Sequence, residues 1–237
     1  WEPQVLKNKT VPELIENWKN ILFERNRTSL NNIPLSDSEM DRVLDMVGLQ
    51  ANTPVKANNF INGPAIAIKR DTNSPDTKHA GLEVYLELFS ASEIAGGSSR
   101  YQIAEQTYFG TDSQFNDRRG DITLLINGMP VIHIELKASG VDISEASNQI
   151  TKYANEGSWK GFMGLVQVFW AITPEDALFF ANAGNARDFN PAFFFRWGDN
   201  DNNVIKNWRE LITGESHILS IPEAHKLIGY YTVADKA

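Results

Sequence analysis

The sequence predicts an α/β protein in which a mixed β-sheet is flanked by helices on both faces. Two helix starts with capping patterns come first, a hairpin-like stretch occupies residues 118–137, and strand-like apolar runs follow a further helix. Elements of both types in one chain favour helices packed against a sheet. We expect the first three core strands to meander, a helix to cross the sheet, and further strands to complete it.

The first helices are predicted from capping boxes, in which Ser or Thr is followed three residues later by Glu. Thr10–Glu13 and Ser36–Glu39 fit this pattern and precede apolar residues at helical spacing, so helices should run to about residues 24 and 48. The Asn-, Pro- and Gly-rich residues 51–75 should hold one short strand, 65–69.

Later elements are predicted from apolar periodicity and turn residues. Expected helices cover 81–95, 142–155 (capped by Asp142 with Glu145) and 204–211; expected strands cover 101–109, 164–172, 177–181 and 193–197; residues 110–120 form a polar loop, and Ile221-Pro-Glu belongs to a tail. The dense aromatic residues of the last strands are interpreted as core rather than as a platform for stacked bases.

The stretch 118–137 carries charges that strands normally avoid. Two sets of side chains should point to opposite faces of the second strand, because side chains alternate in a strand: Val131, His133, Glu135 and Lys137 on one face, and Ile132, Ile134 and Leu136 on the other. The first face therefore ends in an acid and a base.

The register of this hairpin decides whether Asp121 joins that face. Asn127-Gly128 is typical of a two-residue turn, which would place Asp121 opposite Ile134. A three-residue loop, 127–129, would instead place Asp121 opposite Glu135 and Pro130 at the start of the strand. We expect the longer loop, because it alone assembles a site.

Asp121, Glu135 and Lys137 on one face would suit phosphodiester hydrolysis. Two carboxylates can hold Mg²⁺, and a metal with a nearby ammonium stabilises charge developing on phosphate. The competing interpretation is a solvated strand face preceded by a turn residue, because Glu-x-Lys alone is a weak signal. His133 shares the face, where it is interpreted as a structural histidine that could also support the site.

Asp121 with Glu135-Leu-Lys137 resembles the PD-(D/E)xK nuclease motif, with Gly120 in place of proline. The wider sequence resembles the amino-terminal region of the restriction (R, or motor) subunit of type I restriction-modification enzymes. The segments that carry this resemblance are Asn26-Arg27, Leu35–Glu39, Ile68–Asp71, Glu93–Gly97, Arg100–Gln102, Arg119–Asp121, Asn127–Pro130 and Gln149–Tyr153.

The resemblance implies a PD-(D/E)xK restriction-endonuclease-like fold and a Mg²⁺-dependent type I site-specific deoxyribonuclease, with Mn²⁺ able to substitute. Its expected residues are Asp121, Glu135 and the Leu136 carbonyl as metal ligands, Lys137 beside the attacking water, Gln149 and Tyr153 toward DNA or water, and one of Glu83, Glu87 or Glu93 as a supporting acid, unless these three form only a solvated helix face. Arg118 and Arg119 border the site in a polar loop, where they could contact DNA phosphate or simply be solvated. Gln149 and Tyr153 are one helical turn apart, which makes them neighbours on one face.

Composition limits the remaining possibilities. The net charge of −8 argues against a freestanding DNA binder, so something else should hold the DNA that this chain cuts. The resemblance implies that methylation and specificity subunits and an ATP-driven motor bring double-stranded DNA to it. No P-loop pattern is present, and in the resembled subunit the motor begins near Tyr230, so we expect a truncated domain that uses ATP only through the motor. The sequence lacks cysteine, a membrane-spanning apolar run and a signal peptide, which suits a cytoplasmic protein without membrane contact.

We expect residues 1–80 to form a helical portion packed on a nuclease core of residues 81–237, or both to form one domain. Two other functions remain open. The chain could be a noncatalytic docking domain of the restriction subunit, which would not bind Mg²⁺ at Asp121 and Glu135. It could also be a freestanding PD-(D/E)xK nuclease that acts in repair or on RNA.

Overall fold

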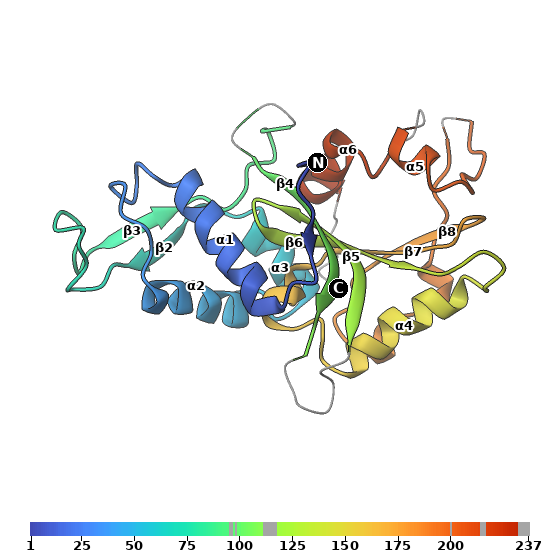
Figure 1. Cartoon of the computed structure of the whole chain (residues 1–237), viewed down its shortest axis with the longest axis horizontal. Coiled ribbons are helices and arrows are strands. Elements are labelled where there is room, and N and C mark those ends of the chain that lie inside the picture. The colour runs from blue at the N-terminus through green and yellow to red at the C-terminus, as the bar shows by residue number, and fades with distance from the viewer. Residues whose placement is uncertain (95–96, 98, 111–117, 200, 214–216, 232–237) are drawn as a thin grey trace.

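A six-stranded mixed sheet with the strand order β1-β4-β5-β6-β7-β8 organises the chain, and a separate two-stranded sheet pairs β2 with β3 (Figure 1). The computed structural model describes residues 1–94, 97, 99–110, 118–199, 201–213 and 217–231. Among these residues no helix combines the length and apolar character needed to cross a bilayer.

The strands are β1 (Leu6–Lys7), β2 (Ile66–Lys69), β3 (Glu83–Leu86), β4 (Tyr101–Tyr108), β5 (Arg119–Ile126), β6 (Met129–Leu136), β7 (Val168–Ile172) and β8 (Ala177–Ala181). The α-helices are α1 (Val11–Arg25), α2 (Asp37–Gln50), α3 (Pro54–Ile61), α4 (Ser144–Asn155), α5 (Glu210–Thr213) and α6 (Ile221–Lys226). Short 3₁₀ segments are η1 (Gly161–Leu165), η2 (Ala186–Asp188) and η3 (Pro191–Phe193), and a π-helical turn, η4, covers Leu227–Tyr231.

The predicted topology of the main sheet is confirmed. β4, β5 and β6 form an antiparallel meander, α4 crosses over, β7 pairs parallel to β6, and β8 pairs antiparallel to β7. β1 pairs parallel to β4, so the first residues of the chain supply an edge strand of the same sheet.

Helices cover both faces of the sheet, as predicted. α4 packs on β6 and β7, while α5 and α6 lie on the opposite side of the sheet (Figure 1). α1 and α2 lie on the side of the molecule that holds the β2–β3 sheet, and α3 lies nearer the main sheet, where it contacts α2 and η1 (Figure 1). Buried apolar residues from Leu14 to Ile228 nevertheless form one continuous cluster.

Both amino-terminal capping boxes are confirmed. The Thr10 hydroxyl accepts a hydrogen bond from Glu13 N at 3.4 Å, and the Glu13 carboxylate accepts one from Thr10 N at 2.9 Å. Ser36 and Glu39 make the same reciprocal bonds at 3.2 and 2.9 Å. These bonds satisfy amide groups that have no partner inside the helix.

The predicted helix over 81–95 is wrong within its described residues, where the chain forms β3 and then irregular backbone. Val84 and Leu86 are buried while Tyr85 is 60% exposed, which is the alternation of a strand. The pairing of β3 with β2 supplies backbone hydrogen bonds, and a short apolar run does not distinguish a helix from a strand. Glu83 and Glu87 therefore do not share a helical face.

Five further expectations need correction. Residues 54–61 form α3, begun by Pro54 and capped by Thr53, instead of loop. The strand expected over 164–172 begins only at Val168, because a 3₁₀ turn occupies 161–165. No strand forms over 193–197, where Phe195 makes one isolated bridge to Phe179.

The helix expected over 204–211 is also wrong, because helical structure begins at Glu210, in α5, and Val204 bridges to Gly198. The expected tail at Ile221-Pro-Glu is the start of α6, with Pro at the first turn, where its missing N–H is tolerated. Outside the β-ladders these short elements are set by tertiary packing that local patterns do not report.

The three-residue hairpin loop was also a wrong prediction. Ile126 pairs with Met129, so Asn127-Gly128 is a two-residue turn. A Cβ atom at Gly128, whose φ is +80°, would lie 2.9 Å from Trp18 Cα, which shows that α1 covers the turn closely. A longer loop would need space that the helix occupies.

A β-bulge restores the alignment that the longer loop was meant to produce. Leu125 pairs with Pro130 but Leu124 pairs with Ile132, so Val131 is an extra residue on β6. Beyond the bulge Ile122 faces Ile134, and the next residues outward are Asp121 and Glu135. The two acids are thus brought together by a different device from the one predicted.

Candidate active site

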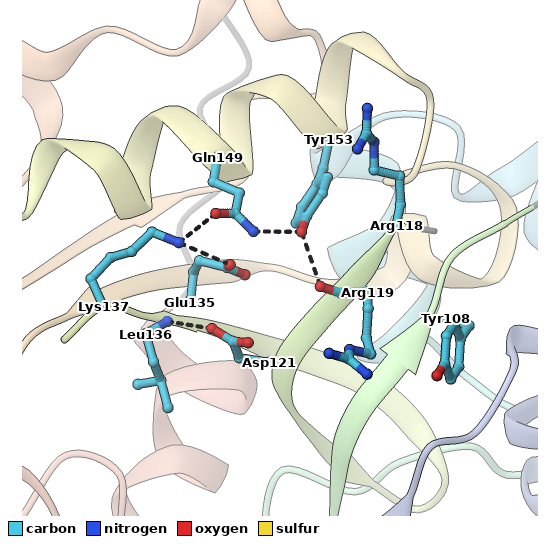
Figure 2. A pocket seen from close by; sticks show the side chains of 9 residues that line it. All are labelled: Tyr108, Arg118, Arg119, Asp121, Glu135, Leu136, Lys137, Gln149 and Tyr153. Carbon is cyan, nitrogen blue, oxygen red and sulfur yellow. Dashed lines mark hydrogen bonds and ion pairs between the residues drawn. The ribbon is translucent and has the colours of Figure 1, made fainter. Parts of the chain in front are cut away.

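The ends of β5 and β6 open into a pocket of about 580 Å³ beneath α4 (Figure 2). It is lined by Tyr108, Arg118, Arg119, Asp121, Glu135, Leu136, Lys137, Gln149 and Tyr153. Apart from Tyr108, all of these residues were singled out from the sequence, and the structure brings them to one place. The supporting acids proposed upstream are elsewhere.

The two carboxylates differ in environment. Asp121 is half-buried, and its Oδ2 accepts a hydrogen bond from Leu136 N at 2.8 Å, which ties the side chain to the neighbouring strand. The Glu135 side chain is only 1% exposed, and its Oε1 accepts no hydrogen bond from the described residues. A buried carboxylate oxygen without a donor is costly unless a cation or an ion pair compensates it.

Lys137 supplies the nearest positive charge to that oxygen. Its Nζ lies 3.7 Å from Glu135 Oε1, and it donates a hydrogen bond to Gln149 Oε1 (Figure 2). Gln149 Nε2 donates to the Tyr153 hydroxyl at 2.6 Å, and that hydroxyl donates to the Arg119 carbonyl at 2.9 Å. A continuous chain of hydrogen bonds therefore runs from the ammonium group to the backbone of β5.

This chain of hydrogen bonds fixes the direction of the Gln149 amide. Because the Tyr153 proton points to a carbonyl, its oxygen is left to accept from the amide nitrogen of Gln149. The amide oxygen must then face Lys137.

α4 carries both Gln149 and Tyr153, but it begins without the predicted capping box. Asp142 Oδ1 accepts a hydrogen bond from Ser144 N, and Ile143 occupies the cap position.

The two arginines have different settings. Arg118 Nε and Nη2 donate to both carboxylate oxygens of Glu156, at 2.7 and 3.0 Å. Arg119, which is exposed and lies in β5 rather than in the predicted polar loop, has its guanidinium 5.9 Å from the centre of the Tyr108 ring. Residues 111–117 of that loop, with Asp112 and Asp117, are outside the described part of the chain.

Sequence reasoning missed Tyr108 and Glu156. Tyr108 pairs with Arg119 across β4 and β5. If the ends of these strands had been known, their register would have indicated that Tyr108 lies beside the pocket. Glu156 follows α4 and had no local signal, because its partner, Arg118, is remote in sequence.

The three upstream acids do not reach the pocket. Glu87 and Glu93 both form ion pairs with the buried side chain of Arg25, with an Nη1–Oε2 distance of 2.9 Å for Glu93. Glu83 lies on β3 opposite Lys69, in the separate two-stranded sheet. Each of these carboxylates is thus placed in a structural setting away from Asp121.

Burial raises the pKa of Glu135 above its ordinary value of 4.5; the hydrogen bond from His133 opposes this, and the charge of Asp121 adds to it. Burial, with the charge of Glu135, also raises the pKa of Tyr153 to about 12. The Tyr153 hydroxyl therefore keeps its proton near neutral pH, as its hydrogen bond to the Arg119 carbonyl requires.

The raised pKa of Glu135 makes a prediction about stability. The folded chain holds this proton more tightly than the unfolded chain, so Glu135 contributes stability that is complete below pH 4.5 and lost as pH rises through the raised pKa. Metal-free Glu135→Gln should therefore unfold at higher urea concentration than the wild type at about pH 8, with the difference shrinking toward pH 5. An equal difference at both pH values would contradict this account.

The mixed sheet, its crossing helix and the acids at the ends of β5 and β6 define a restriction-endonuclease-like α/β protein. The family described as type I restriction enzyme R protein N terminus (HSDR_N) matches residues 6–187. The chain belongs to this family.

Curated relatives agree with this membership. The chain is 30% identical over 210 residues to the type I restriction enzyme SsaAORF53P endonuclease subunit of Staphylococcus saprophyticus, covering 89% of this chain and 20% of the relative. It is 28% identical over 193 residues to the SauMSSORF170P endonuclease subunit of Staphylococcus aureus, covering 81% and 19%. It is 39% identical over 95 residues to the EcoprrI endonuclease subunit of Escherichia coli, covering 39% and 30%. The chain spans about a fifth of the length of the staphylococcal relatives.

Proposed function

We propose that this chain is the Mg²⁺-dependent, PD-(D/E)xK-type DNA endonuclease domain of a type I restriction subunit. The observation that carries the proposal is the convergence of Asp121, Glu135 and Lys137 in one pocket, from two strands aligned by a bulge. Family membership supports the restriction context, and the endonuclease subunits named above support the reaction class.

The pocket residues fit a hard divalent cation. The two carboxylates of the pocket are those of Asp121 and Glu135. Mg²⁺ commonly uses one or two carboxylates and keeps several waters. Asp121, the Leu136 carbonyl and Glu135 Oε1, to which no described residue donates a hydrogen bond, would hold the ion. The ion would supply charge stabilisation and acidify bound water.

The other pocket residues would act on DNA and water. Lys137, held by Gln149, would orient the attacking water and stabilise negative charge that develops on the scissile phosphate. The exposed guanidinium of Arg119 would contact a neighbouring phosphate, whereas Glu156 would hold Arg118 at the pocket wall. The net charge of −8 fits a domain to which a motor and the methylation and specificity subunits deliver DNA.

Nicking of supercoiled plasmid with Mg²⁺ or Mn²⁺, measured together with Mn²⁺ binding, tests the proposal. We expect one Mn²⁺-dependent activity that a chelator removes. Binding without nicking would show that cleavage requires the motor and partner subunits. Cleavage should then be seen in the complete enzyme. Absence of Mn²⁺ binding would contradict the proposal and favour a noncatalytic docking domain.

The chain of hydrogen bonds through α4 makes a separate prediction. Tyr153→Phe removes the acceptor that orients the Gln149 amide, so Lys137 loses its fixed partner. Cleavage should fall by about tenfold, the lower end of the effect of outer-shell partners, while Mn²⁺ affinity is unchanged. Tyr108→Phe is the matched control, because Tyr108 lines the same pocket outside this chain of bonds. Equal losses in both variants would refute the orienting role.

A further inference from the structure

His133 is a fully buried histidine with a polar neighbour at each ring nitrogen. It lies on β6 with 0% exposure, two residues before Glu135. Its Nδ1 is 3.1 Å from the Thr123 hydroxyl, and its Nε2 is 3.3 Å from Glu135 Oε2. Thr123 is directly opposite His133 on β5 and is also buried. The three side chains thus form a short buried row that ends at the proposed metal site.

Aromatic rings hold the imidazole in place. The ring centres of Phe109, Trp159 and Phe169 lie 5.8, 4.8 and 6.3 Å from that of His133. A Cβ atom at Gly120 would lie 2.4 Å from Phe109 Cζ and 2.5 Å from His133 Cε1, so any side chain there would displace these rings. The close packing of Phe109 and His133 explains why glycine stands where the motif's name has proline.

The hydrogen-bond partners define which nitrogen carries the proton. A carboxylate oxygen can only accept, so the bond to Glu135 requires Nε2–H. In neutral imidazole Nδ1 is then an acceptor, and the Thr123 hydroxyl is placed to donate to it. Thr123 therefore selects the ring form that can hold Glu135.

The bond from His133 engages only one carboxylate oxygen. Oε2 of Glu135 is taken by the imidazole, while Oε1, on the side of Lys137, has no hydrogen bond from the described residues. Without His133 the carboxyl group could rotate, because little else among the described contacts restrains Oε2.

We propose that Thr123 and His133 are positioning residues that orient Glu135 so that its Oε1 is available to a divalent cation. This inference rests on the proposed function, since it assumes a cation at Asp121 and Glu135. Partners that orient a metal-ligating group typically contribute about 10–100-fold to metal affinity.

The test is Mn²⁺ binding by the chain, followed by calorimetry and by the electron paramagnetic resonance signal of free Mn²⁺. His133→Met and His133→Gln both remove the ring. Only Gln keeps an N–H donor three bonds beyond Cβ, the same separation as that of Nε2 in histidine. We expect His133→Met to weaken binding about tenfold or more, and His133→Gln to restore most of it. Thr123→Val should weaken binding several-fold, whereas Thr123→Ser, which keeps the hydroxyl, should match the wild type.

The outcomes separate this inference from the proposed function. A wild-type chain that binds no Mn²⁺ would contradict the metal site itself. A wild type that binds, with His133→Met binding equally well, would overturn only the positioning role. Equal weakening by Met and Gln would also overturn it, because ring packing alone would then explain the effect. If thermal unfolding shows that the His133 variants do not fold, the Val and Ser variants of Thr123 decide.

Discussion

Asp121→Asn is expected to lower DNA cleavage by about 10³-fold or more, the upper range for loss of one group that stabilises a transition-state charge. Asparagine keeps an oxygen that can accept the hydrogen bond from Leu136 N, so the β5–β6 geometry should survive while the negative charge is lost. With only the Glu135 carboxylate left, Mn²⁺ affinity should fall together with cleavage. The measurements are single-turnover plasmid cleavage by the complete enzyme and Mn²⁺ titration of the chain.

Asp142→Asn is the matched control for this charge change. Asp142 caps the backbone before α4 through Ser144 N and lies outside the pocket. Its substitution should leave Mn²⁺ affinity and cleavage near wild-type values. Full cleavage by Asp121→Asn would remove Asp121 from the proposed site.

Lys137→Met is expected to reduce cleavage by about 10²–10³-fold while Mn²⁺ binding is kept. Methionine retains an apolar stem but lacks the ammonium group that lies 3.7 Å from Glu135 Oε1 and donates to Gln149. A loss of cleavage without a loss of metal would separate the ammonium group from the metal ligands. The measurement is again single-turnover cleavage beside Mn²⁺ titration.

Lys152→Met provides the corresponding control, because Lys152 is an exposed lysine on α4 that does not line the pocket. It removes the same charge from the same region of the chain. Cleavage by Lys137→Met at the wild-type rate, with metal bound, would show that the assigned role of Lys137 is wrong.

The meander of β4, β5 and β6 and the helix that follows it could be predicted from the sequence, because the turn and apolar signals there are local. The edge strand β1 was not predicted, because its partner, β4, is remote in sequence. The capping boxes of α1 and α2 were equally local and are confirmed. The helix expected over 81–95 failed because the partner that makes β3 a strand, β2, lies earlier in the chain. Pairing between remote segments is invisible to periodicity.

The candidate site divides in the same way. Alternation along the second strand predicted that Glu135 and Lys137 share a face, and the structure places both in one pocket. Asp121 was expected beside them for the wrong reason, because the β-bulge and not a longer loop aligns it with Glu135. The contacts of Glu87 and Glu93 with Arg25, and of Arg118 with Glu156, join residues far apart in sequence. The sequence alone therefore indicated the carboxylates of the pocket, but not which of the other charged residues form ion pairs with residues remote in sequence.

The bulge at Val131 divides the β5–β6 hairpin into two parts with different roles, one in packing and one in the pocket. The part nearest the turn is bound to α1 by close packing at Gly128, and Asn127 donates to Leu88 O at 3.1 Å. The part beyond the bulge carries the acids. The extra residue shifts the alternation of side chains in the outer part by one position. The turn can therefore remain short and buried while the bulge determines the face on which the carboxylates lie. Substitutions at the turn should thus alter mainly the stability of the fold, and substitutions beyond the bulge mainly the properties of the proposed site.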